Sequence, residues 1–369
     1  MPELPEVETV ARDLRGLVVG ATIADARCDW PRLLRTHDPA AFAAAIAGRT
    51  VLGVGRRAKQ LLVALSGDAV LTVHLKMTGQ LFVVPASAPA DRHVHLVLAF
   101  EDGRELRFRD IRKFGRVGLY PADPATGEPL LEAGGAGVFA GHGPEPLADA
   151  FTVRAFRERL RARRGRLKPL LLDQAFLAGV GNIYADEALW RARLHPLRSA
   201  ASLRRPDGAR LYEALRGVLA EAVERRGSSI DDYTAPEGDG SMQERLQVYQ
   251  RAGEACPRCG RPIRRIVVGG RATHFCSWCQ RLPAADRAAA AALLRGAVPR
   301  RRDGRGRGPR WTELAGAGAL GRTAPEERAA AERARRQEAT RRAAATRRAR
   351  ARAGWSPSAP SVDRTAEVR

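Results

Sequence analysis

Four cysteines in the last third of the sequence form two closely spaced pairs that could bind a metal ion. Cys256 and Cys259 make the first pair and Cys276 and Cys279 the second, which gives the pattern C-x2-C-x16-C-x2-C. Two such pairs on adjacent turns can close a tetrahedral Zn²⁺ site. Because all four ligands are cysteines, no coordination position is left for a substrate. We therefore predict one structural zinc ion.

The segment between the two cysteine pairs is typical of a β-hairpin. Residues 263–268 and 272–275 are rich in β-forming side chains, and Gly269 and Gly270 stand between them as a two-residue turn. The segment carries three arginines, Arg264, Arg265 and Arg271. A basic hairpin held rigid by zinc suits the groove or the backbone of DNA, although zinc ribbons also bind proteins.

The start of the chain, MPELPEVE, places a proline and a carboxylate just ahead of a predicted helix. If Met1 is removed, Pro2 becomes a secondary amine, and the reference pKa of an α-amino group is about 8. The positive end of the adjacent helix favours the neutral, nucleophilic form of that amine. Glu3 could then donate and accept protons. Most chains that begin with Met-Pro are ordinary chain ends, so the residue types alone favour that simpler interpretation.

A glycine-containing turn leads into a helix near the middle of the chain. Residues 168–190 are predicted to fold as helix, turn and helix, with Asn182 at the N-cap position of the second helix. The free backbone N–H groups of a helix N-terminus form a natural phosphate site. Most junctions of this kind only cap a helix, so the pattern does not decide between capping and phosphate binding.

Regular elements must position these residues, and the first third of the chain shows mainly β periodicity. Residues 5–17 place apolar side chains at helical spacing, with Pro5 tolerated in the first turn. Short β-forming runs then cover residues 60–65, 69–75, 80–84, 94–100, 104–109 and 117–120. Gly67 and Asp68 supply one of the turns between them. This spacing predicts an antiparallel sandwich or barrel.

The following part of the chain is predicted to be helical. Residues 121–146 are rich in Pro, Gly and Ala, which suggests a loop or hinge. Predicted helices cover residues 152–163, 167–173, 182–191 and 208–226, ahead of the cysteine module at 245–281. Beyond Leu282 the sequence is biased towards Ala and Arg, with 21 basic and 9 acidic residues. We predict that much of this tail is disordered.

The composition favours a polyanionic partner. The chain has 63 Lys and Arg against 41 Asp and Glu, a net charge of +22, so nucleic acid is the simplest expectation, although a coding bias would give a similar composition. The acidic chain start does not resemble a secretory signal, and no run approaches the roughly 20 apolar residues of a spanning helix. We expect a cytoplasmic protein without membrane association. Paired cysteines then favour metal over disulfides, and Cys28 is expected to act as a small apolar residue.

Five separated segments, taken together, resemble the formamidopyrimidine-DNA glycosylase family. They are MPELPEVET at residues 1–9, HLKMTG at 74–79, DIRKFG at 110–115, GVGNIYADE at 179–187, and the cysteine ribbon that ends CQR at 279–281. Their order matches that of the family, and the resemblance extends to about residue 282.

The resemblance implies an α+β fold with DNA in a cleft between domains. It predicts an N-terminal catalytic β-sandwich domain, a hinge linker, a helix-two-turn-helix DNA-binding domain with a lesion-capping loop, a four-cysteine zinc ribbon and a basic tail. The expected boundaries are 1–130, 131–150, 151–244, 245–282 and 283–369, respectively. This order agrees with the periodicity described above.

By the same resemblance the chain is a DNA glycosylase and AP lyase for oxidised purines, namely 8-oxoguanine and formamidopyrimidines. Pro2 would attack C1′ of the damaged nucleotide to form a Schiff base, Glu3 would protonate the opening sugar, and β,δ-elimination would nick the strand. Lys59 matches the family lysine that contacts the phosphate beside the lesion. Asn182 and Arg271 match positions that grip nearby phosphates. The implied partner is damaged double-stranded DNA, bound by a monomer in the bacterial nucleoid.

An enzyme that acts on a base must flip it out of the duplex and fill the vacated stack. Met77, Arg112 and Phe114 match the void-filling residues of the family, and they combine a flexible apolar chain, a planar cation and an aromatic wedge. Neighbouring glycines favour exposure of Met77 and Phe114 over core packing. His74 lies in the same loop as Met77, where it could orient the backbone or contact DNA.

Two features depart from the family pattern. Residues 229–243 correspond to the flexible segment that closes over the flipped base, and Met242 stands where many relatives have an aromatic residue. The lesion preference is therefore open. The tail beyond Leu282 lies outside the resemblance, and its positive charge suits transient contacts with DNA, or it has no function.

Two alternative functions are compatible with parts of the pattern. The sister branch of the family acts on oxidised pyrimidines with the same fold and nucleophile, but the ELPEVE start favours the purine branch. A catalytically silent zinc-ribbon DNA-binding protein would not need Pro2, Glu3 and Lys59. The intact trio therefore favours an enzyme.

Overall fold

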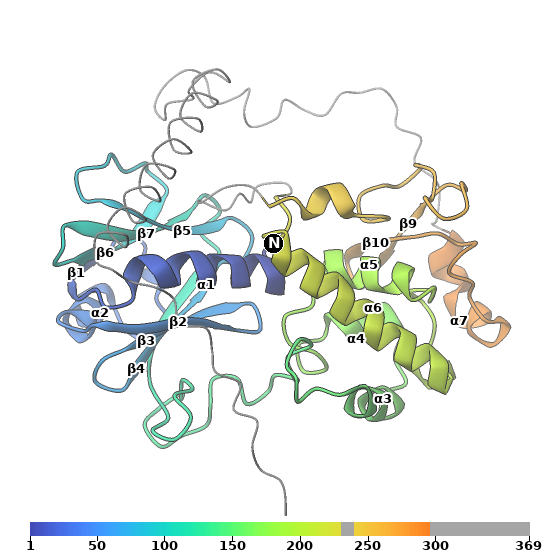
Figure 1. The fold of residues 1–369 in the computed structure, drawn as a ribbon, viewed down its shortest axis with the longest axis horizontal. Coiled ribbons are helices and arrows are strands. Elements are labelled where there is room, and N and C mark those ends of the chain that lie inside the picture. Colours follow the sequence, from blue (N-terminus) through green and yellow to red (C-terminus); the bar gives the residue numbers. More distant parts are fainter. Residues whose placement is uncertain (230–239, 296–369) are drawn as a thin grey trace, which may run out of the picture. The chain divides into compact units, whose positions relative to one another are not determined.

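The first 121 residues fold into two antiparallel sheets and a long helix, here called the N-terminal lobe. The computed structural model describes residues 1–229 and 240–295 (Figure 1). The strands are β1 (Ile23–Cys28), β2 (Val51–Arg57), β3 (Gln60–Leu65), β4 (Ala69–His74), β5 (Gly79–Pro85), β6 (Val94–Phe100), β7 (Arg104–Asp110) and β8 (Arg116–Pro121). One sheet has the order β1-β6-β7-β5 and the other β2-β3-β4-β8. The predicted antiparallel β domain is thus confirmed.

One apolar core fills the space between these two sheets. Leu61 on β3 and Leu98 on β6 come from different sheets and belong to the same buried cluster. Buried and half-buried positions alternate along β3, as expected of a strand that turns one face to a core. Helix α1 (Leu4–Val18) buries its apolar face in the same cluster. The core therefore fixes the helix whose first turn follows Pro2 and Glu3.

Two short elements complete the N-terminal lobe. The 3-10 turn η1 (Pro31–Leu33) and helix α2 (Pro39–Ile46) lie between β1 and β2 in the chain. Phe42 and Ile46 of α2 are fully buried and close one end of the core.

Residues 153–224 form the helical lobe. Its helices are α3 (Val153–Arg161), α4 (Leu167–Leu172), α5 (Asn182–Arg191) and α6 (Arg205–Glu224), with the 3-10 turn η2 (Ala200–Ser202) before α6. These bounds agree with the predicted helices to within three residues at each end. Phe156, Phe176 and Tyr184 are buried in its core. Among the described residues, none of the helices is long and apolar enough to cross a membrane.

The cysteine module folds around a two-stranded hairpin. The 3-10 turn η3 (Met242–Arg245) precedes it, and strand β9 (Arg264–Val268) pairs antiparallel with β10 (Arg271–Phe275). Gly269 and Gly270 make the turn with φ of +54° and +72°, a conformation that glycine adopts without a steric penalty. The predicted hairpin is confirmed.

The prediction of a disordered tail after Leu282 is wrong for its first part. Residues Ala284–Arg295 form helix α7, in which Ala290 is fully buried. Alanine has the highest helix propensity of all residues, so an Ala-rich segment folds as a helix when it can pack against an apolar surface. The rest of the predicted tail, residues 296–369, lies outside the described residues.

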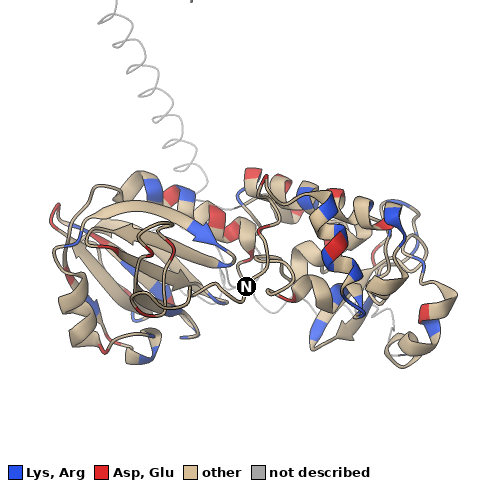
Figure 2. Cartoon of the chain, turned by 90° about the horizontal axis from the view of Figure 1, so that it is seen from below, with Lys and Arg blue, Asp and Glu red and all other residues tan. Residues whose placement is uncertain are grey.

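Basic and acidic side chains are interspersed over the described part of the chain (Figure 2). Many arginines are neutralised locally. Asp207, at the start of α6, forms ion pairs with Arg198, Arg204 and Arg210. The positive net charge therefore does not by itself mark one surface for nucleic acid, and the site must be located from individual residues.

Candidate active site

The start of α1 meets the start of α5, which lies about half the chain away in sequence. Glu3 precedes α1, and its backbone N–H donates to Glu6 at 2.8 Å. The Glu3 carboxylate accepts hydrogen bonds from the backbone N–H groups of Ile183 at 2.8 Å and Tyr184 at 3.4 Å. Glu3 therefore occupies the positive N-terminal end of α5, and these two amides are not free to bind a phosphate.

Glycines in the turn before α5 allow this close approach. Gly179 has a φ of +84°, and its carbonyl oxygen accepts a hydrogen bond from the Leu4 N–H at 3.0 Å. A Cβ added to Gly181 would lie 2.3 Å from the carboxyl carbon of Glu3. Any larger residue at either position would displace the chain start, so the Gly-Val-Gly sequence is what lets Pro2 and Glu3 sit at this turn.

Asn182 does not cap α5, and that prediction is corrected. The N-cap residue is Gly181, and Asn182 is the first residue of the helix. Its side-chain amide instead donates to the carbonyl oxygen of Ala272 on β10 at 3.0 Å. The Asn182 Oδ1 atom is buried and has no hydrogen-bond partner among the described residues. Asn182 therefore joins α5 to the hairpin that carries Arg271.

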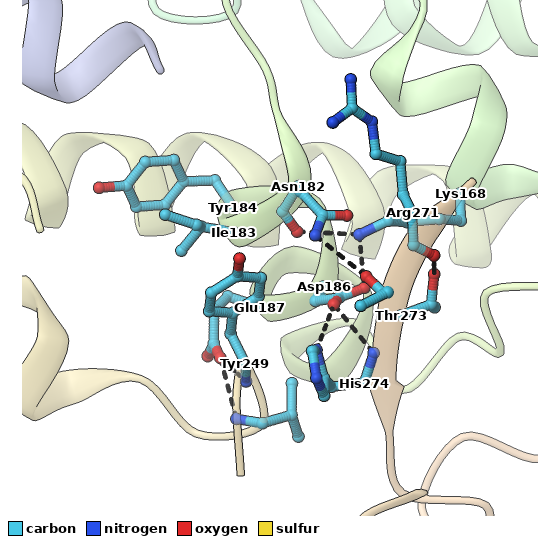
Figure 3. A network of polar contacts seen from close by, with 12 residues as sticks. Lys168, Asn182, Ile183, Tyr184, Asp186, Glu187, Tyr249, Arg271, Thr273 and His274 are labelled. Atoms are coloured by element: carbon cyan, nitrogen blue, oxygen red, sulfur yellow. Dashed lines mark hydrogen bonds and ion pairs between the residues drawn. The ribbon is translucent and has the colours of Figure 1, made fainter. Parts of the chain in front are cut away.

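A buried ion pair, which the sequence analysis did not identify, supports this junction (Figure 3). Lys168 Nζ lies 2.6 Å from Asp186 Oδ1 and donates to the Asn182 carbonyl oxygen at 2.8 Å, and the Lys168 and Asp186 side chains are completely buried. The second Asp186 oxygen accepts from the His274 backbone N–H at 2.9 Å. Removal of one member of such a pair typically costs about 3–5 kcal/mol. A lysine inside the apolar run LKPLLL was the available sequence clue.

Arg271 lies at the edge of this network and points away from it. It is the first residue of β10 and is exposed, and Figure 3 shows its guanidinium directed away from Asp186 and His274. The buried contacts therefore fix the backbone of Arg271 and leave its side chain available to a ligand.

Lys59 lies in the tight turn between β2 and β3. Glu145, a residue of the linker between the lobes, stabilises this turn. Ala58 has a φ of +54°, and its N–H donates to Glu145 at 2.6 Å. Arg56 and Arg57 each form an ion pair with the same carboxylate at 2.8 Å. Glu145 stabilises a backbone conformation that alanine rarely adopts, and so it positions Lys59. The Pro-, Gly- and Ala-rich composition of the linker indicated only a loop or hinge.

Glu3 and Lys59 shift each other's ionisation. Burial raises the pKa of Glu3 above its ordinary 4.5, while the positive charge of Lys59 opposes that shift. Burial also lowers the pKa of Lys59 below its ordinary 10.5, while the charge of Glu3 opposes the shift and that of Arg271 adds to it. The structure thus places a carboxyl group that retains its proton more readily than usual beside a lysine that loses its proton more readily.

The lowered pKa of Lys59 predicts a pH dependence of DNA binding. The ammonium charge is lost as the pH rises through a value below 10.5, so any phosphate contact made by Lys59 should weaken in the same range. The charges that act on Lys59 are those of Glu3, Arg271, Glu6 and Lys76. We expect the alkaline loss of affinity for an abasic-site duplex to diminish in Lys59→Arg, whose guanidinium stays charged. The measurement is the dissociation constant across the alkaline range.

Lys113→Arg is the control for this titration. Lys113 is an exposed lysine of the loop that carries Arg112 and Phe114, so it lies on the proposed DNA-binding side without being assigned a phosphate contact. It should leave the pH profile of binding unchanged. An alkaline loss that persists undiminished in Lys59→Arg would show that another group causes it.

The three predicted void-filling residues are brought together in two neighbouring loops. Met77 and Phe114 are 36% and 46% exposed, which is unusual for large apolar side chains and agrees with the predicted exposure. The Arg112 guanidinium carbon lies 5.0 Å from the centre of the Phe114 ring. The two loops therefore present an apolar chain, a cation and an aromatic ring to solvent.

The buried carboxylate of Asp110 connects these two loops. It is buried at the end of β7, and it accepts hydrogen bonds from the Thr78 hydroxyl, the Arg112 N–H at 3.2 Å and the Gly115 N–H at 2.7 Å. Gly115 also packs tightly on Phe108, since an added Cβ would lie 2.4 Å from that ring. One carboxylate thus fixes both loops relative to each other.

His74 is placed to orient the backbone. Its Nδ1 accepts a hydrogen bond from the Lys76 N–H at 3.1 Å, in a turn where Lys76 has a φ of +56°. Burial lowers the pKa of His74 to about 3, and the charges of Lys76 and Lys59 add to the shift. His74 is therefore neutral at physiological pH, which favours the orienting role over an ionic contact with phosphate.

The residue that directly precedes the predicted capping segment contacts the start of α1. Ser228 donates its backbone N–H to Glu6 at 2.8 Å, and the Tyr184 hydroxyl donates to the same carboxylate. Residues 230–239 of the segment lie outside the described residues. Met242 was expected to lie in the capping loop, but it is fully buried in the core of the helical lobe.

The four cysteine sulfurs fit one zinc ion. They all lie within 4.8 Å of one another, with Cys256 and Cys279 separated by 4.0 Å and Cys259 and Cys276 by 3.5 Å. Tetrahedral zinc with Zn–S bonds of about 2.3 Å requires sulfurs about 3.8 Å apart. The predicted ligand set is thus assembled, with no open position for catalysis.

Three domain matches to known families cover most of the described chain. Residues 1–117 match the formamidopyrimidine-DNA glycosylase N-terminal domain, residues 142–234 match the H2TH domain of that glycosylase, and residues 253–282 match a zinc finger found in FPG and IleRS. These matches agree with the expected order of β domain, helical domain and ribbon.

Curated relatives and solved structures give the same picture. Formamidopyrimidine-DNA glycosylase of Herpetosiphon aurantiacus is 50% identical over 282 residues, which are 76% of this chain and 100% of that protein. The enzyme of that name from Roseiflexus sp. is 49% identical over 283 residues, with coverage of 76% and 100%. A crystal structure of wild-type Lactococcus lactis Fpg with DNA that contains N7-benzyl-Fapy-dG has a TM-score of 0.69 at 38% identity, and covers 76% of this chain and 100% of its own. A complex of Lactococcus lactis Fpg with abasic-site DNA has a TM-score of 0.69 at 38% identity, with coverage of 76% and 99%.

Proposed function

We propose that this chain, which belongs to the formamidopyrimidine-DNA glycosylase family, excises oxidised purines from duplex DNA through a Schiff base on Pro2. The family makes it a DNA glycosylase and AP lyase with a structural zinc finger. To this we add the lesion class, the nucleophile and the residues that assist it. The observation that carries the proposal is the placement of Glu3, beside Pro2, between the N-terminus of α5 and Lys59.

The nucleophile requires removal of Met1. In the full chain the Pro2 nitrogen is part of a peptide bond, whereas the free chain start would be a secondary amine. Met1 is 42% exposed, so a peptidase can reach it, and Pro2 behind it is buried. The lone pair of Pro2 then forms a bond to C1′ as the bond between C1′ and the ring oxygen breaks, and the base leaves in the following step. One difficult substitution becomes two easier steps.

Glu3 is assigned the proton transfer. Its raised pKa, caused by burial, keeps a proton on the carboxyl group more readily than on an exposed glutamate. That proton goes to the ring oxygen of the sugar as the C1′–O bond breaks. The C1′–N bond to the base then breaks, the base leaves with the proton released from the Pro2 nitrogen, and the imine forms between Pro2 and C1′. β,δ-Elimination from the imine then nicks the strand.

The remaining site residues hold the DNA in the strained conformation that the reaction needs. Lys59, Asn182 and Arg271 are proposed to contact phosphates around the lesion. The two exposed loops would enter the stack that the flipped base vacates. Their void-filling side chains are those of Met77, Arg112 and Phe114. The hydrogen bonds of Asp110 fix the Met77 and Phe114 loops relative to each other, and Glu145 fixes the turn that carries Lys59.

A panel of damaged duplexes tests the proposal. We expect the zinc-loaded enzyme to nick duplexes that contain 8-oxoguanine or formamidopyrimidine, and to act more slowly on an oxidised pyrimidine. Glu3→Gln should slow base release by about 10²- to 10⁴-fold, because it removes the transferable proton. Its affinity for an abasic-site duplex should change much less, since the amide oxygen can still accept from Ile183. Single-turnover nicking measures the loss of rate, and equilibrium binding measures the change in affinity.

The outcomes separate the alternatives. A preference for the oxidised pyrimidine would assign the chain to the sister branch. Binding without nicking of any duplex would leave a silent DNA-binding protein. Equal losses of affinity and base release in Glu3→Gln would contradict its role in proton transfer.

A further inference from the structure

Helix α7 lies beyond the part of the chain that the family matches cover. The zinc-finger match ends at residue 282, and the relatives from Herpetosiphon aurantiacus and Roseiflexus sp. are covered along their whole length by alignments of 282 and 283 residues. Helix α7 (Ala284–Arg295) starts two residues after that match. It is therefore an addition to the folded unit for which the family activity gives no reason.

Helix α7 packs against one face of the zinc-ribbon hairpin. Its fully buried Ala290 belongs to an apolar cluster with Ile266 and Val268 of β9 and Phe275 of β10, and Leu293 and Leu294 pack on that cluster. Alternation along β9 places Ile266 and Val268 on one face, and Val267 between them is exposed. The helix and the hairpin lie side by side in Figure 1.

The opposite face of the hairpin is held by α5. His274, next to Phe275, points to the other face of β10 and contacts Asp186 through its backbone N–H at 2.9 Å and its ring at 3.2 Å. The hairpin is thus clamped between α5 and α7, with Arg271 at its tip.

Two polar contacts tie α7 to the helical lobe itself. The guanidinium of Arg166, which precedes α4, donates to the Ala289 carbonyl oxygen at 2.6 Å. The Ser202 hydroxyl in η2 donates to Asp286 at 2.9 Å. These contacts are directional and involve a lobe that is separate from the ribbon, so they fix where α7 lies, and through its apolar face they fix the hairpin.

We propose that α7 is a positioning element for DNA binding, which holds the β9–β10 hairpin against the helical lobe so that Arg271 is presented in one orientation. The zinc ion holds the cysteine end of the ribbon, and α7 holds the strands. This inference rests on the proposed contact of Arg271 with DNA.

Two aspartate substitutions on the same helix test this proposal in the full-length, zinc-loaded protein. Ala290→Asp places a carboxylate in the buried contact, where an unpaired charge is strongly disfavoured. Ala292→Asp introduces the same charge at an exposed position and is the matched control. We expect Ala290→Asp to speed amide hydrogen exchange across residues 264–275 about tenfold or more, and to weaken binding of an abasic-site duplex by a similar factor. Ala292→Asp should change both by less than about twofold.

Further readouts distinguish a local effect from misfolding. Exchange in β3, β4 and α6 should stay at the wild-type rate in Ala290→Asp, which shows that both lobes remain folded. Ser202→Ala removes one of the two polar contacts with α7, together with the contacts of the hydroxyl with Ser199 and Arg198. It should shift hairpin exchange in the same direction by a smaller factor.

Hairpin exchange in Ala290→Asp equal to that in Ala292→Asp would overturn the proposal. So would faster exchange with unchanged DNA affinity, because the orientation of the hairpin would then not matter for binding. Failure of the proposed enzymatic function is seen separately, as a wild-type protein that forms no borohydride-trapped complex with the same duplex.

Discussion

Pro2→Gly is expected to lower the yield of the borohydride-trapped complex with an abasic-site duplex by at least about a hundredfold, in line with the loss of a covalent nucleophile. Borohydride reduces an imine to a stable amine, so only an enzyme that forms a Schiff base is trapped. Glycine leaves a primary amine in place of the secondary one and removes the ring that is buried beside Glu3. The amine then loses its fixed position at the turn before α5.

Pro85→Gly is the matched control for this experiment. It makes the same change at an exposed proline at the end of β5, and trapping should stay at the wild-type level. A second variant that retains Met1 should also abolish trapping, because the Pro2 nitrogen stays in a peptide bond.

The lysine side chains carry the amines that could replace Pro2 as the nucleophile. The chain contains four of them, Lys59, Lys76, Lys113 and Lys168. Trapping that survives both Pro2→Gly and retention of Met1 would move the nucleophile to one of them. Lys59 would be the first candidate, since burial lowers its pKa and its charge acts on Glu3.

Cys276→Ser, or removal of zinc by a chelator, is expected to weaken DNA binding by about a hundredfold or more. Small metal modules draw much of their folding energy from the metal. Loss of one thiolate releases Cys276 from the other three cysteines, and Cys276 directly follows Phe275, the last residue of β10. The strand that carries Arg271 then loses its fixed end, and the contact of Ala272 with Asn182 is strained. Equilibrium binding to an abasic-site duplex is the measurement.

Cys28→Ser is the control, because Cys28 lies in the N-terminal lobe, far along the chain from the four-cysteine cluster. Its affinity for DNA and its zinc content should match those of the wild type. Unchanged affinity after complete removal of zinc, verified by metal analysis, would show that the ribbon is dispensable for binding.

Local sequence patterns were sufficient to predict the metal ligands, the strands from β3 onwards and the helices α1 and α3 to α6, but they did not predict β1, β2 or α2. The spacing of the cysteines predicted a cluster that the structure assembles, and the Gly-Gly turn predicted the hairpin between β9 and β10. The strands between β3 and β8 and the helices α4 and α5 follow their predicted bounds closely. Each of these features depends on residues within about 30 positions of one another, so periodicity and spacing can reveal it.

Tertiary structure decided the contacts that make these elements a site. Glu3 accepts hydrogen bonds from the start of α5, 180 residues away, and Asn182 turns from its predicted cap towards β10. Glu145 fixes the turn of Lys59 from 87 residues away. No local pattern indicates such pairings, because a carboxylate is compatible with a surface, a cap or a buried ion pair until its partner is known.

Helix α7 illustrates the same distinction between local propensity and tertiary context. Its sequence, AADRAAAAALLR, has high helix propensity but little apolar area, so composition alone indicated disorder. A short helix of this kind is marginal in isolation, and it becomes stable when a neighbouring surface buries one face. The alanines supply the helix propensity, but they did not lead to the prediction of a helix, because only the apolar face of the β9–β10 hairpin in the tertiary structure decides that this segment folds as one.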